Sequence, residues 1–70
     1  MNKTYYHSLK TKSYKYRVKP STMAEFVISK HDLKGNLITK KRYDGVNTRN
    51  WMKNAEARTG LEFERIELKL

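Results

Sequence analysis

The sequence predicts an α+β domain: a small antiparallel sheet with the element order β-β-β-α-β and one amphipathic helix packed on one face. Three observations predict it. Apolar and basic residues alternate over residues 14–19, a turn sequence separates two β-rich runs, and apolar residues at helical spacing precede a glycine. Seventy residues with 37% hydrophobic content support one small domain, which we expect over residues 14–70.

The first predicted strand covers residues 14–19. Tyr14, Tyr16 and Val18 alternate with three basic residues, which is the period of a half-buried strand. We therefore expect both tyrosines to face the core with Val18, and the basic residues to face outward. Pro20 is expected to end the strand, because proline has no N–H to donate to a sheet.

Two further strands are predicted at residues 24–30 and 36–43, where residues that favour β structure are dense. The sequence HDLKGN between them has the polar residues and the glycine of a tight reversal. Gly35 is free to take a positive φ. The two strands are therefore expected to form a hairpin.

A helix is predicted from a cap at Asn47 or Thr48 to about Thr59. Gly60 stands where helices commonly end in a left-handed residue. The residues expected to form the buried stripe of this helix are Val46, Trp51, Met52, Ala55 and Thr59.

The last ten residues, LEFERIELKL, change phase. Leu61 and Phe63 are odd-numbered, whereas the later apolar residues are even-numbered, so a strand needs a bulge near Glu64-Arg65 to keep both halves on one face. A helix is the alternative, because Phe63, Ile66 and Leu70 also fit helical spacing. We favour the strand, whose edge is expected to allow a homodimer.

Residues 1–13 show neither strand nor helical periodicity, and we expect a flexible basic arm there. Residues 1–20 contain six of the sixteen basic residues and none of the seven acidic ones. The net charge of +9 attracts polyanions. We therefore expect a small non-enzymatic protein that binds RNA or DNA. RNA or single-stranded DNA is expected to be preferred, because the tyrosines of the arm can stack on unpaired bases.

The expected interface combines the arm, a basic sheet face and the exposed side of the helix. Phosphates need cations, and unstacked bases stack on aromatic rings. The candidate nucleic-acid-binding residues are Tyr5, Tyr6, Lys10, Lys12, Lys15, Arg17, Lys19, Lys40, Arg42, Arg49 and Lys53.

An alternative function is that of a protein inhibitor or adaptor that docks on an acidic surface of a larger host enzyme. Small, charge-rich, cysteine-free domains of this kind resemble the accessory proteins of phages in composition. Over residues 14–59 the predicted element order also resembles the DNA-binding domains, built of a three-stranded sheet and a helix, of tyrosine integrases and of plant AP2 domains. This topological likeness implies DNA binding and assigns no role to any single residue.

The chain contains no cysteine, which excludes disulfides and thiolate metal sites, and His7 with His31 cannot alone form a closed zinc site. No catalytic motif or glycine-rich phosphate loop is present, so we expect neither enzymatic activity nor a cofactor. No apolar run reaches the roughly 20 residues of a membrane-spanning helix. We expect a soluble, cytoplasmic protein.

Overall fold

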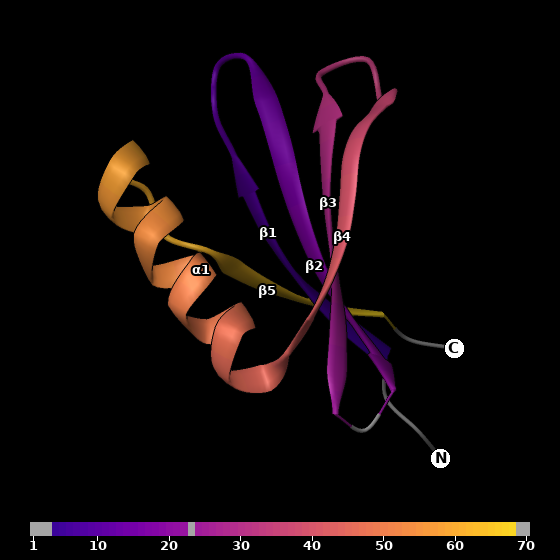
Figure 1. Ribbon diagram of the computed structural model, residues 1–70. Helices are drawn as coiled ribbons and strands as arrows, with labels where there is room; N and C mark the ends of the chain where they lie inside the picture. The colour runs from indigo at the N-terminus through magenta and orange to yellow at the C-terminus, as the bar shows by residue number, and fades with distance from the viewer. Residues whose placement is uncertain (1–3, 23, 69–70) are drawn as a thin grey trace.

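The computed structural model describes residues 4–22 and 24–68 of the chain. Within these residues the elements are β1 (Thr4–Lys10), β2 (Tyr14–Thr22), β3 (Glu25–Asp32), β4 (Leu37–Asp44), α1 (Gly45–Thr59) and β5 (Glu64–Leu68). The strands form one antiparallel sheet in the order β4-β3-β2-β1-β5 (Figure 1). The predicted fold class is confirmed, with one strand more than predicted.

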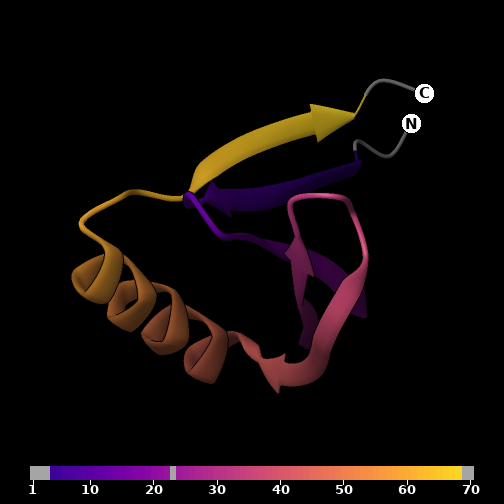
Figure 2. The same cartoon turned by 90° about the horizontal axis from the view of Figure 1, so that it is seen from above.

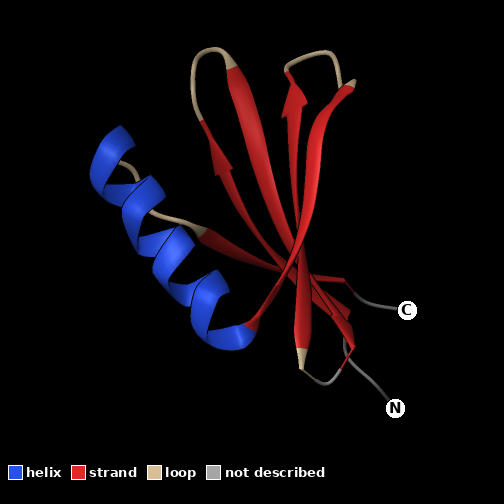
Figure 3. Cartoon of the chain, viewed as in Figure 1, coloured by secondary structure: helices blue, strands red, loops and turns tan. Residues whose placement is uncertain are grey.

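Strands β1 to β4 follow one another as neighbours, and α1 then leads the chain back so that β5 lies beside β1 (Figure 3). Seen from above, the sheet bends from β5 round to β4, and α1 lies on the side toward which it bends (Figure 2). One face of the sheet is therefore covered in part by the helix. The opposite face carries no element of the described chain.

The segment predicted as a flexible arm is instead strand β1, between β2 and β5. Its residues alternate, with Tyr5, His7 and Leu9 on the helix side. Leu9 is 1% exposed and belongs to the core. Tyrosine and histidine are each partly apolar and partly polar, so their alternation gives no clear apolar period. The predicted boundary between an arm and a domain at residue 14 is therefore wrong, whereas residues 1–3 lie outside the described residues.

Strand β2 continues through Pro20, which was expected to end it. Pro20 pairs with Phe26 of β3, whereas the pairing of β1 with β2 reaches only from Lys15 to Val18. The register also shifts between Pro20 and Thr22. Proline is tolerated in a strand at such a place, where the pairing with one neighbouring strand has stopped and the pairing with the other is irregular.

The predicted hairpin between β3 and β4 is confirmed. Asp32 organises the turn, because its Oδ1 accepts hydrogen bonds from the backbone N–H groups of Lys34 at 2.9 Å and Asn36 at 2.8 Å. Gly35 has φ 96°, as expected from its position. The N–H of Asn36 is the largest of the causes that lower the pKa of Asp32 below its usual value.

Helix α1 begins earlier than predicted, because Asp44 is its N-cap and accepts the N–H of Asn47 at 2.8 Å. Its end is as predicted: Gly60 has φ 72°, and its N–H donates to the carbonyl of Glu56 at 2.8 Å. Val46 was expected in the buried stripe but is 72% exposed. Thr48 is buried in the stripe instead, with 3% exposure. Two residues along a helix are rotated by about 200°, so Val46 and Thr48 point to nearly opposite sides.

The C-terminal segment is a strand, as favoured, but it has no bulge near Glu64-Arg65. Strand β5 pairs with β1 in unbroken register from Thr4↔Leu68 to Ser8↔Glu64. The change of phase arises because Leu61 and Phe63 lie in the connection before the strand.

The core lies between the sheet and the C-terminal half of α1. Val18 and Ala55 are completely buried, and Ile28 is 4% exposed. The ring of Trp51 meets Tyr16 edge to face, with centroids 4.8 Å apart, and Tyr16 meets Tyr14 in the same way at 4.9 Å. The prediction that both tyrosines face the core is confirmed.

Candidate nucleic-acid interface

The sheet face opposite α1 collects most of the predicted cations. Tyr16 and Val18 face the helix, so the residues between them on β2 point away from it. The strand register aligns this side across the sheet, because Lys15 pairs with Lys10 on β1, and Ser29 of β3 pairs with both Arg17 and Lys40. We call this surface the basic face; its cations are Lys10, Lys15, Arg17, Lys19, Lys40 and Arg42.

Arg17 lies at the centre of the basic face. Its guanidinium carbon stands 4.8 Å from the ring centroid of Tyr6, which projects from β1 on the same side. The Nε atom of Arg17 is buried and has no hydrogen-bond partner within the described chain. The side chain of Arg17 is therefore partly buried beside the ring of Tyr6.

Few carboxylates neutralise the basic face. Arg42 approaches Glu25, with Nη1 and Oε1 3.7 Å apart, at the end of the face near the start of α1. The other five cations have no carboxylate oxygen within 4.0 Å among the described residues. Asp44 and Glu64 lie at its margins, where Asp44 caps the helix and Glu64 belongs to edge strand β5. The centre of the face thus carries uncompensated positive charge.

Two shallow hollows share Arg17 and His31 on this face. One, of about 340 Å³, extends to Lys19 and Lys40. The other, of about 170 Å³, extends to Lys10 and Lys15. The prediction from sequence did not include His31 in the site. Its place opposite Lys15 follows once the register between β2 and β3 is known.

Tyr5 and Tyr6 were predicted to act together, but the structure places them on opposite faces of β1. Tyr6 belongs to the basic face. Tyr5 lies on the helix side, where the guanidinium carbon of Arg65 is 4.0 Å from its ring centroid and the ring of His7 is 5.6 Å away. Both tyrosines are partly buried, so the expected pair of freely exposed stacking rings is absent from the described chain.

The remaining predicted residues do not join the basic face. Lys12 is exposed in the turn between β1 and β2. Arg49 and Lys53 are exposed on α1, which lies on the other side of the sheet. The eleven predicted site residues therefore divide among the basic face, the adjoining turn and the helix side.

The chain is thus a small α+β domain with one sheet face partly covered by a helix and one open basic face. Comparison with protein-family models, with curated proteins and with solved structures gives no match for this chain. No helix in the described part of the chain is long and apolar enough to cross a membrane.

Proposed function

We propose that the protein binds nucleic acid without catalysis, through contacts between the basic face and the phosphate backbone. The observation that carries this proposal is the gathering of six cations from three strands, β1, β2 and β4, on one open face, five of them without a carboxylate partner in the described chain. Cations that neutralise phosphates release counterions, and this release drives sequence-independent binding.

The geometry favours backbone contact over base stacking. Tyr6 is the one tyrosine of this face, and it already carries Arg17 over its ring. A preference for single strands based on paired tyrosines therefore loses its support, whereas phosphate contact needs only the cations. We expect binding to RNA and to DNA, with affinity that falls steeply as salt rises.

Fluorescence anisotropy with labelled RNA and DNA oligonucleotides at several salt concentrations tests the proposal. The variant Lys15→Gln/Lys19→Gln/Lys40→Gln should weaken binding and reduce the slope of log K against log salt by about two to three. The control Lys34→Gln/Lys41→Gln/Arg58→Gln removes the same charge from exposed residues outside the basic face and should change the slope much less. Equal losses in both variants, or binding indifferent to salt, would contradict the proposal.

The same cations also suit an acidic protein surface, as an inhibitor or adaptor of a larger enzyme would need. A pulldown from lysate separates this alternative from the first. Partners that remain after nuclease treatment favour the acidic protein, and partners that disappear favour nucleic acid.

A further inference from the structure

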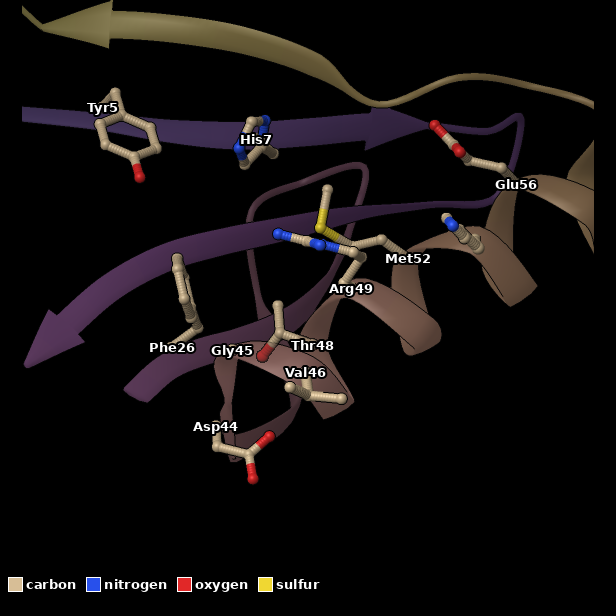
Figure 4. Close-up of a pocket in the computed structure, with 11 residues that line it drawn as sticks. Tyr5, His7, Phe26, Asp44, Gly45, Val46, Thr48, Arg49, Met52 and Glu56 are labelled. Carbon is tan, nitrogen blue, oxygen red and sulfur yellow. The ribbon is translucent and has the colours of Figure 1, made fainter. Parts of the chain in front are cut away.

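A groove remains between α1 and the sheet, on the side of the sheet away from the basic face, and its lining on the helix extends to Glu56. Tyr5 and His7 project from β1 toward the helix, and Arg49 and Met52 project from the helix toward β1 (Figure 4). Phe26 of β3 also lines the groove. The groove has a volume of about 750 Å³, which lies within the roughly 300–1,000 Å³ typical of sites for small ligands.

Other residues of the same stretch of α1 face the core and do not line the groove. Trp51 and Ala55 pack on Tyr16 and Leu9 in the core. Phe26, Met52 and the ring of Tyr5 are left as apolar walls, each only partly buried. Such walls suit a flat apolar body.

Two cations and two carboxylates line the groove, and they are not paired with one another. Arg49 and Lys53 line it one helical turn apart, and neither has a carboxylate oxygen within 4.0 Å among the described residues. The two acids of the lining already accept backbone hydrogen bonds: Glu56 Oε2 from the N–H of Phe63 at 2.7 Å, and Asp44 Oδ1 from the N–H of Asn47 at 2.8 Å. An anion entering the groove therefore meets two cations that the lining carboxylates do not pair.

We propose that this groove binds a small molecule that joins a flat apolar body to one anionic group, a phosphate or a carboxylate. Arg49 and Lys53 hold the anion, and Tyr5, Phe26 and Met52 contact the body.

His7 adds a neutral polar contact in the same groove. Its burial lowers the pKa of His7 below its usual value, and the guanidinium of Arg65 lowers it further. The imidazole is therefore neutral at pH 7, with one nitrogen to donate and one to accept a hydrogen bond.

NMR titration of the full chain with naphthyl phosphate, naphthol and inorganic phosphate tests the proposal. Saturable shifts at Tyr5, His7, Phe26 and Met52 are expected with naphthyl phosphate, which should bind at least about tenfold more tightly than either other probe. Equal binding of naphthol or of inorganic phosphate would overturn the combined specificity. Shifts confined to the basic face would overturn the site.

Arg49→Gln/Lys53→Gln should weaken the binding of naphthyl phosphate at least about tenfold. The control Arg58→Gln/Lys34→Gln removes two exposed charges outside the groove and should weaken it less than about twofold. An equal effect of both variants would show binding to net charge alone. The nucleic-acid test uses cations of the opposite sheet face, so either proposal can fail while the other stands.

Discussion

At the scale of single residues, two threonines of α1 differ in what their hydroxyl groups bind. Thr48 is 3% exposed, and its Oγ1 is buried without a hydrogen-bond partner in the described chain. Thr59 donates its hydroxyl to the carbonyl of Ala55 at 2.8 Å and accepts the N–H of Leu61 at 3.3 Å. An unsatisfied buried hydroxyl lowers stability, whereas a bonded hydroxyl at a helix end supports it.

Thr48→Val should therefore raise the free energy of unfolding by about 1 kcal/mol, because it replaces an unsatisfied hydroxyl by a methyl group of similar size. Thr59→Val is the matched control and should lower this free energy by about 1 kcal/mol. Urea unfolding followed by the fluorescence of Trp51 measures both. A loss of stability in Thr48→Val would show that its hydroxyl is bonded in solution.

At the scale of elements, β1 decides the architecture. It is hydrogen-bonded on both sides, to β2 and to β5, and it supplies Leu9 to the core. Among the described residues, strand β5 pairs with no other strand, so its place in the sheet depends on β1.

Leu9→Ala should lower the free energy of unfolding by about 3 kcal/mol, because the side chain is completely buried. Lys12→Ala, in the exposed turn that follows, should change it by less than about 0.5 kcal/mol. Chemical denaturation compares the two. Similar small effects at both positions would mean that this segment is an arm and not a strand.

At the scale of the whole molecule, charge opposes folding. The chain has a net charge of +9, and both ion pairs of the described residues, Arg42–Glu25 and Arg65–Glu67, lie between exposed side chains. Exposed pairs contribute little, so mutual repulsion among the remaining cations outweighs them.

Raising the salt concentration from about 0.05 M to about 0.5 M should therefore increase the free energy of unfolding, because salt screens this repulsion. The variant Lys15→Gln/Lys19→Gln/Lys40→Gln carries less of the repulsion and should show a smaller increase. Urea titrations at several salt concentrations give the comparison. A stability that falls with salt would indicate net attraction in the folded state instead.

Much of the fold was predictable because its signals are local. The alternation from Tyr14 to Val18 marks β2, and Gly35 and Gly60 mark the hairpin turn and the helix end. The shared side of Lys15, Arg17 and Lys19 also follows from period two alone. The N-terminal strand was missed because tyrosine and histidine obscure that period. Val46 was misplaced because the helix begins after the cap at Asp44, so Val46 lies inside the helix and its direction follows the helical turn.

The sequence by itself determined the element types, the turns and the excess of positive charge, because backbone stereochemistry, periodicity and charge are properties of short segments. Only the tertiary structure decided that β1 lies between β2 and β5, that Tyr5 and Tyr6 occupy opposite faces, and that Lys40 joins Arg17 across β3. Those facts depend on which distant strands pair and in which register. The packing of the buried side chains of the whole chain selects the strand pairs and their register.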